Sequence, residues 1–317
     1  GALYIIDMYR GIVQDDYYMT DELREQVFER ELETPVGMGR IWRVRHAGGK
    51  TARHFPDFGD ASDAELILAL GHPNGWVRDT AQRLLLGRGG DHAVALAAIA
   101  SGHNTVAALH AIWTLHGRGE LQRKLVMKIA RLDDTQRQIQ ALRAGRSLLS
   151  AADLVTLYEE LSPDSADVLS MQLAFAMGDH ASDASVRRSL VTLLTANLES
   201  PYIRQAVVRA VAGEELLFLS EYLGSEHLGA VSEAARTALS SLASGAYRSL
   251  RGDITSGESA NPALLELLAL AESRSNDNAW QQMAMLEGMK SVAASTDFVP
   301  AVLEASPEIF SDGSISE

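Results

Sequence analysis

Residues Leu70 to Gly89 read LGHPNGWVRDTAQRLLLGRG and carry the signals of one amphipathic helix together with both of its ends. Asn74 is a favourable N-cap, because its short side chain can accept a hydrogen bond from an unpaired N–H of the first turn. The apolar positions that follow fall on a single helical face: Val77, Ala81, Leu84 and Leu85. The glycine-rich stretch from Gly87 to Gly90 ends the helix and is not a phosphate-binding loop, since no strand precedes it.

The same pattern recurs along the chain at a fixed period. Capping residues follow one another at intervals of 30 residues, at Asn74, Asn104, Asp134 and Asp164. The position seven residues after the cap is alanine in the first three repeats, at Ala81, Ala111 and Ala141, and methionine in the fourth, at Met171. A small residue at that position lets two helices approach closely, and a constant period is typical of a solenoid.

The periodicity predicts an all-α fold: a HEAT-like α-solenoid, built as a right-handed superhelix of about seven helix pairs over residues 62–308. We expect one set of helices to begin near Asn74, Asn104, Asp134, Asp164, Pro201, Gly229 and Asn276. We expect the other set to begin near Ser62, Asp91, Glu120, Ala151, Asp183, Glu214 and Asn261. A stretch rich in Gly, Ser and Asn predicts a longer loop between Ser244 and Pro262, and residues 309–317 form a polar tail.

Residues 1–46 have a different character. Ala2 to Met8 read as a buried strand, Thr20 to Glu31 as a short amphipathic helix, and Arg40 to Arg45 as a second strand. Two strands cannot form a stable sheet alone, so we expect this β remnant to complete a larger structure. Residues 47–61 are predicted to be a linker to the helical array, and the abrupt strand at the start suggests a fragment of a longer protein.

The composition excludes several classes of function. Among 317 residues there is no cysteine, which excludes disulfides, thiolate metal sites and covalently attached c-type haem within this chain. The formal charge of −14 disfavours nonspecific binding to nucleic acid or to anionic lipid. No apolar run is long enough to suggest a transmembrane helix, so no membrane partner is expected.

Candidate functional residues are few. Arg10 lies in a turn after the first strand, where it would meet an anionic cofactor or sugar, but a structural ion pair with Asp15 or Asp16 is the simpler interpretation. Asp7, at the end of the first strand, lacks the convergent oxygen ligands that calcium requires, so a structural hydrogen bond is favoured.

The histidines do not predict a metal site. His103, His110 and His116 are separated by 7 and 6 residues, and no His-x-x-x-His spacing occurs. His54 or His72 would be an axial haem ligand only if a cytochrome docked, and surface or capping roles are favoured. We therefore predict no catalytic residue, no metal site and no cofactor in this chain. The tryptophans are interpreted as fillers of the core or of contacts between repeats, at Trp42, Trp76, Trp113 and Trp280.

One segment has an uneven charge. Between Arg118 and Arg146 the sequence has eight basic residues and three acidic ones. The basic residues are Arg118, Arg123, Lys124, Lys128, Arg131, Arg137, Arg143 and Arg146. Ala151 to His180 then holds six acidic residues and no Lys or Arg. This basic segment is a candidate binding patch for an acidic partner, although a solvated helix face is the simpler interpretation. Nucleic acid is not the expected partner, because no interleaved aromatic residues accompany the charges.

Four stretches resemble a known family. They are LYIIDMYRGIVQ (Leu3 to Gln14), MTDELREQVFERELETPVGMGRIWRV (Met19 to Val44) and the repeats from Leu70 to Gly89 and Leu109 to Gly119. Together they resemble the membrane-bound dehydrogenase or haem-binding proteins of planctomycetes. In that family a glucose/sorbosone dehydrogenase-like β-propeller precedes HEAT-like repeats and a cytochrome c domain. The likeness is specific over Leu3 to Gly119, while the earlier blades and a Cys-x-x-Cys-His motif do not occur in this sequence.

The resemblance implies that residues 1–46 are the remnant of a propeller's last blade. It implies that the array is a scaffold in an exported or periplasmic, dehydrogenase-like, haem-associated protein. The array would hold a sugar- or alcohol-oxidising propeller at a fixed distance from a cytochrome, with partners on its concave face. Haem c and a quinone cofactor or calcium would then belong to other domains. The alternatives are a free-standing HEAT-repeat module for protein–protein interaction and, less favoured, a HEAT-like nucleic-acid-binding enzyme.

Overall fold

A computed structural model describes residues 2–34, 36–48, 56–161, 167–225, 231–251, 262–274 and 278–293. The chain divides into two compact units, Gly1–Asp57 and Phe58–Glu317. The boundary falls inside the stretch 47–61 for which a linker is predicted. Several predicted features lie outside the described residues. They are the helix starts at Asp164, Gly229, Asn261 and Asn276, part of the linker, the end of the array from residue 294 and the tail 309–317.

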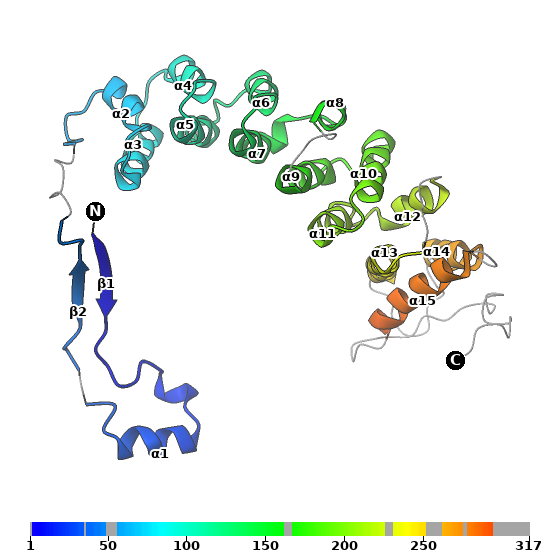
Figure 1. Cartoon of the computed structure of the whole chain (residues 1–317), viewed down its shortest axis with the longest axis horizontal. Coiled ribbons are helices and arrows are strands. Elements are labelled where there is room, and N and C mark those ends of the chain that lie inside the picture. The colour runs from blue at the N-terminus through cyan, green and yellow to red at the C-terminus, as the bar shows by residue number, and fades with distance from the viewer. Residues whose placement is uncertain are drawn as a thin grey trace. The chain divides into compact units, whose positions relative to one another are not determined.

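The first unit is a two-stranded antiparallel sheet with a helical excursion between its strands (Figure 1). Strand β1 (Leu3–Asp7) pairs with β2 (Arg40–Val44) so that Leu3 lies opposite Val44 and Asp7 opposite Arg40. A 3₁₀ turn, η1 (Asp16–Tyr18), and helix α1 (Asp21–Glu29) lie between them, and the side chain of Thr20 caps α1 by accepting from the N–H of Leu23. The strand–helix–strand order predicted from the sequence is confirmed.

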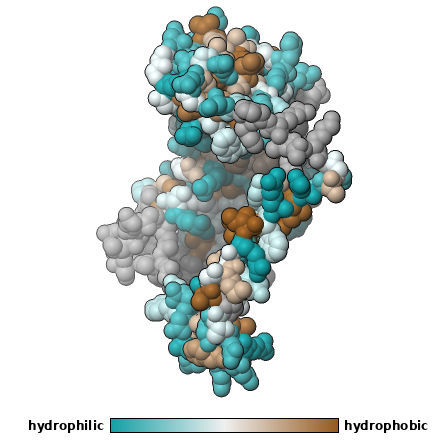
Figure 2. All heavy atoms as spheres, turned by 90° about the vertical axis from the view of Figure 1, so that its left-hand side faces the viewer, coloured by the Kyte–Doolittle hydropathy of each residue, from teal (hydrophilic) through white to brown (hydrophobic). Residues whose placement is uncertain are grey.

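The prediction that the first strand is buried is wrong. Four residues of β1 and all five of β2 are exposed, and the large apolar side chains stand in solvent on both faces. Ile6 is 77% exposed and Ile41 68% exposed. Hydrophobic side chains are visible at the surface of this unit in the lower half of Figure 2. An apolar sequence predicts burial only where a second layer covers the strand, and two strands supply none.

The second unit is an all-α helical-repeat array, as predicted. Its helices are α2 (Asp63–Ala69), α3 (Gly75–Gly87), α4 (Ala93–Ala100), α5 (Thr105–Gly117), α6 (Arg123–Ala130), α7 (Thr135–Ala144), α8 (Ala151–Leu161), α9 (Asp167–Gly178), α10 (Ala184–Ala196), α11 (Pro201–Ala210), α12 (Glu215–Gly224), α13 (Glu233–Arg251), α14 (Pro262–Glu272) and α15 (Ala279–Ala293). A 3₁₀ turn, η2 (Arg146–Leu148), follows α7.

The helices form pairs that are arranged in two layers. Each even-numbered helix from α2 to α14 packs against the odd-numbered helix that follows it (Figure 1). The odd-numbered helices α3 to α15 also pack against one another in succession, as do α6 to α14 in the other layer. Each pair therefore buries its apolar stripe against its neighbours rather than in one central core.

The capping residues act as the spacing predicts. Asn74, Asn104 and Asp134 accept from the N–H groups of the first turns of α3, α5 and α7. Ala81, Ala111 and Ala141 are fully buried at the helix crossings. The spacing between helix start and buried small residue is not kept in the next repeat, where α9 begins at Asp167 and Met171 is half-buried.

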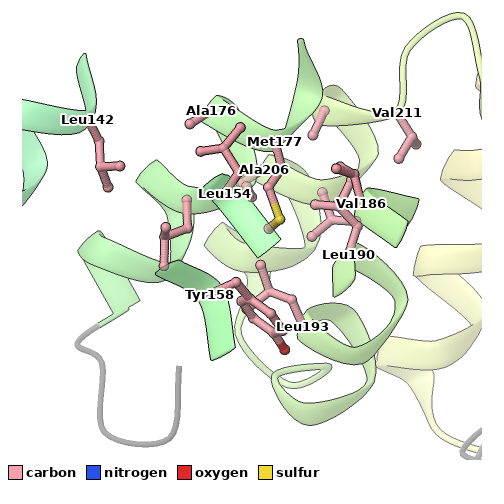
Figure 3. Close-up of a cluster of buried hydrophobic side chains, with 14 of the residues drawn as sticks. Leu142, Leu154, Tyr158, Ala176, Met177, Val186, Leu190, Leu193, Ala206 and Val211 are labelled. Atoms are coloured by element: carbon pink, nitrogen blue, oxygen red, sulfur yellow. The ribbon is translucent and has the colours of Figure 1, made fainter. Parts of the chain in front are cut away.

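The core is continuous from α2 to α15. Figure 3 shows one part of it, where Leu154, Leu190 and other buried side chains of α8 to α11 lie around Met177. These side chains are essentially inaccessible to solvent. Truncating one such leucine to alanine typically costs about 2–5 kcal/mol, so the array gains its rigidity from contacts between repeats.

The long loop predicted from Ser244 is wrong in its first part. Helix α13 continues to Arg251, so the Ser and Gly residues of that stretch lie on a helix; residues 252–261 lie outside the described part. Gly288 in α15 marks the place where that helix lies against α13. A Cβ at that position would collide with the backbone oxygen of Ser240, so α13 and α15 cross with their backbones in close contact.

Candidate interaction sites

Asp7 has a structural role at the end of β1. Its carboxylate accepts from the N–H of Tyr9 at 2.9 Å and from Nε1 of Trp42 at 3.0 Å, and it pairs with Arg40 at 3.3 Å. These hydrogen bonds, that of Trp42 first, lower the pKa of Asp7 although desolvation opposes them. The structural hydrogen bond favoured from the sequence is confirmed.

The expected pairing of Arg10 with Asp15 or Asp16 is wrong. Asp15 caps the 3₁₀ turn, and Asp16 pairs with Arg24. Arg10 is exposed and has no hydrogen-bond or ion-pair partner in the described part of the chain. It remains a candidate contact for an anionic group on a partner.

Arg40, which sequence reasoning did not single out, organises this turn instead. Its guanidinium lies 4.1 Å from the ring centroid of Tyr9 and 5.4 Å from that of Trp42. Tyr9 has a φ of 44°, a left-handed conformation that is strained for a non-glycine residue. The contacts of Asp7 and Arg40 with Tyr9 hold that conformation.

The basic segment is mostly neutralised within the array. Arg118 donates to the backbone oxygens of Leu85, Arg88 and Gly90 and pairs with Glu120. Arg137 donates to Asp134 and to the backbone oxygen of Gly102, and Arg143 donates to Gln172. Lys124 and Lys128 are exposed and have no such partner among the described residues.

The remaining arginines of the segment pair with the acidic stretch that follows it. Arg123 pairs with Asp153, Arg131 with Glu160 and Arg146 with Asp179. The separation of each pair is about one repeat, so a base on one repeat meets an acid on the next. The uneven charge along the sequence therefore reflects pairing between repeats, and the patch offers less free positive charge than its composition suggests.

Arginines also fix the loops between helices. Arg78, Arg187 and Arg204, each in the first turns of a helix, donate to the backbone oxygen of the residue six positions earlier. These oxygens belong to His72, Ala181 and Leu198. In each of these helices the arginine directly follows a hydrophobic residue, at Val77, Val186 and Ile203, and it anchors the preceding loop.

The histidines are distributed as structural or surface groups. His110 lies between Arg78, whose Nε is 3.1 Å from its Nε2, and Gln82; burial lowers its pKa, and Arg78 adds to that effect. His72 accepts from the N–H of Asn74 at 3.0 Å. His103 and His116 are exposed, and His54 lies outside the described residues. No group of three metal-ligating side chains gathers within the part that the structure describes.

The tryptophans divide into two kinds. Trp113 donates to Gln140 at 3.0 Å between α5 and α7, and Trp280 packs against the core, as predicted for contacts between repeats. Trp42 and Trp76 are instead 51% and 62% exposed, so the prediction that they fill the core is wrong.

A cavity lies between α11 and α13, and no sequence pattern predicted it. Its volume is about 420 Å³, and three arginines line it: Arg204, Arg209 and Arg248. Glu215, at the start of α12, also lines the cavity and is 6% exposed. Arg204 and Arg209 lie on α11, whereas Arg248 lies on α13 and joins them only through the stacking of two repeats, which no local pattern reveals.

Comparison with known proteins gives one family match. Residues 1–48 match a family described as a domain of unknown function, DUF7133. This range corresponds to the strand–helix–strand unit. No curated protein matches the chain.

The chain is also similar to two engineered proteins whose crystal structures were determined by the Northeast Structural Genomics Consortium. Each is 16% identical to it. The first likeness covers 74% of this chain and 100% of the engineered one, and the second covers 77% and 99%. Both have a TM-score of 0.31, too low to support an argument about this protein. None of the described helices is long and apolar enough to cross a membrane.

Proposed function

We propose that this chain is the helical scaffold of a larger dehydrogenase-like, haem-associated protein that is exported or periplasmic. In this role the array holds a sugar- or alcohol-oxidising domain and an electron-accepting cytochrome at a fixed separation. The oxidising chemistry belongs to the other domains, which would carry haem c and a quinone cofactor or calcium. The sequence resemblance over Leu3 to Gly119 is the basis for this identity.

The exposed apolar strands of the first unit are the observation that carries the proposal. Leu3, Ile6, Ile41 and Trp42 are each at least half exposed, on a sheet of two strands. Free strand edges and apolar faces of this kind favour pairing with further strands. We therefore propose that β1 and β2 complete a larger sheet, the last blade of a propeller, and thereby attach the array to it.

The pairing of arginine side chains within the array favours a scaffold role. Arg118, Arg123, Arg131, Arg137, Arg143 and Arg146 each have a partner within the array. Charged side chains that are engaged in this way stiffen the contacts between repeats and are poorly placed to act on a substrate.

The complete reading frame tests the proposal. We expect it to encode further β-rich blades before Gly1 and a Cys-x-x-Cys-His motif after Glu317, and we expect the complete protein to show the absorbance of c-type haem. A reading frame without either feature, yielding a haem-free protein, would reject the haem-associated assignment. It would leave the second candidate, a free-standing interaction module, for which the arginine-lined cavity is the favouring observation.

A further inference from the structure

We propose that the cavity between α11 and α13 binds a short acidic peptide segment of a partner protein through the guanidinium groups of Arg204, Arg209 and Arg248. This inference deepens the proposed scaffold role, on which it rests, because it names the chemistry of one partner. The cavity is called the arginine groove below; its other lining residues include Thr237, Ser241, Gly245 and Glu215.

The positive charge of the arginine groove is available to a ligand. Arg209 and Arg248 are exposed, and neither has a hydrogen-bond or ion-pair partner among the described residues. Arg204 uses Nη1 to donate to the backbone oxygen of Leu198 at 2.6 Å and keeps its other donors. An arginine presents five N–H donors in a fork that matches a carboxylate, so these three side chains suit anionic groups. This availability contrasts with the basic segment, where most guanidiniums are paired.

Glu215, the one carboxylate among the described residues of the arginine groove, does not neutralise it. Glu215 accepts from the N–H of Gly213 at 2.8 Å and from the hydroxyl of Ser249 at 3.2 and 3.3 Å. Gly245 gives it room, since a Cβ there would lie 3.1 Å from Oε1 of Glu215. Glu215 thus joins α12 to α13 and forms no ion pair with Arg204, Arg209 or Arg248. Three positive charges against one negative charge make the site locally basic in a chain of net charge −14.

The shape of the arginine groove favours an extended chain over a small ion. Its lining on α13 runs from Thr237 to Ser249, which is roughly 18 Å at 1.5 Å per residue. An extended peptide of about five residues spans that distance. Small side chains at Ser241, Ser244 and Gly245 leave the space between the helices open. A dicarboxylate would reach only part of this length.

Charge selects against nucleic acid as the occupant. The net charge of −14 repels a long polyanion, whereas a segment with two or three carboxylates meets mainly the local field of the three arginines. None of the described residues that line the groove is aromatic, so bases would find no stacking surface among them. Recognition of acidic motifs by arginine clusters is a recurrent mode of peptide binding.

Fluorescence anisotropy on purified 1–317 tests the inference, with a labelled, end-capped Glu-Ala-Glu-Ala-Glu peptide as the probe and the matching Gln-Ala-Gln-Ala-Gln peptide as its neutral counterpart. We expect saturable binding of the acidic peptide that weakens as salt rises. The Arg209→Gln/Arg248→Gln double variant should raise the Kd at least tenfold, because each loses charge-assisted hydrogen bonds. Ser241→Trp, which fills the groove and keeps its charge, should also weaken binding.

Arg188→Gln is the matched control, because Arg188 is an exposed arginine on α10 that has no side-chain partner in the described part of the chain and does not line the groove. Its Kd should equal that of the wild type. Equal weakening by Arg188→Gln, equal binding of the neutral peptide, or no binding at low salt would overturn the inference. Glutarate binding as tightly as the peptide would overturn the assignment to a peptide. None of these outcomes bears on the reading frame or on haem, so failure here is distinguishable from failure of the proposed function.

Discussion

Arg123 on α6 and Asp153 on α8 form a two-point ion pair in which Nε and Nη2 of the guanidinium donate to the two carboxylate oxygens. Asp153 is 4% exposed, and its carboxylate also accepts from the N–H and the hydroxyl of Ser150. One side chain therefore caps the start of α8 and ties it to the preceding repeat. This double use makes Asp153 the strongest example of how the array joins its repeats.

Asp153→Ala should lower the free energy of unfolding by about 2 kcal/mol, because it removes a cap together with a charge-assisted pair whose carboxylate is buried. Asp179→Ala is the matched control, since Asp179 pairs with Arg146 where both side chains are 44% exposed. An exposed pair contributes less than about 1 kcal/mol. Chemical denaturation followed by circular dichroism measures both losses, and equal losses would contradict this account of α8.

The stability of the array should fall in acid, and Asp153 should contribute to that fall. The hydrogen bonds from Arg123 hold the pKa of Asp153 well below its ordinary value of 3.8, although desolvation opposes them. A folded pKa below the unfolded one means that the stabilisation is complete above pH 4 and is lost as the pH falls below it. Unfolding midpoints between pH 7 and pH 2 should therefore drop less steeply for Asp153→Asn than for the wild type. Parallel curves would show that Asp153 is not linked to folding.

Gly288→Ala should loosen the packing of α15 on α13. The added methyl group would collide with the backbone oxygen of Ser240, and overpacking of this kind costs typically about 1–3 kcal/mol. Gly87→Ala is the control, because a Cβ at the end of α3 meets nothing within 4 Å. That change should be neutral or should stabilise the helix by up to about 1 kcal/mol. Thermal melts of the two variants compare them, and a neutral Gly288→Ala would mean that the helices are not in close backbone contact.

Ile6→Ser should leave the stability of purified 1–317 nearly unchanged, within about 0.5 kcal/mol, because Ile6 is 77% exposed. Leu190→Ala, in the fully buried core, should cost about 2–5 kcal/mol. The same denaturation measurement compares the two substitutions. A large loss for Ile6→Ser in the isolated chain would show that the strands already have a covering layer.

The sequence was informative where the signal is local. The caps at Asn74, Asn104 and Asp134 and the small residues at their fixed spacing predicted the helices and their pairing, because capping and amphipathic burial depend on residues within two turns. The loop predicted from Ser244 failed in its first part because α13 continues to Arg251, and Gly245 there faces the side chain of Glu215 rather than breaking the helix. Burial of β1 was predicted from its apolar composition, and composition does not reveal whether a covering layer exists.

The candidate sites were less predictable, because they depend on contacts between repeats. The excess of arginine between Arg118 and Arg146 suggested a free patch, and its partners lie about one repeat away, at Asp153, Glu160 and Asp179. The arginine groove combines Arg204 and Arg209 on one helix with Arg248 on another. Such groupings follow from the register of stacked helices, which a single sequence does not specify.

Hydrogen exchange at the amides of β1 and β2, compared between purified 1–317 and the complete protein, tests whether these strands join a larger sheet. We expect rapid exchange in both strands of 1–317, where the two-stranded sheet is exposed, and strong protection of the same amides in the complete protein. The helices from α3 to α11 should be protected equally in both. Slow exchange of β1 in 1–317, or no gain of protection in the complete protein, would contradict the proposal that these strands join a larger sheet.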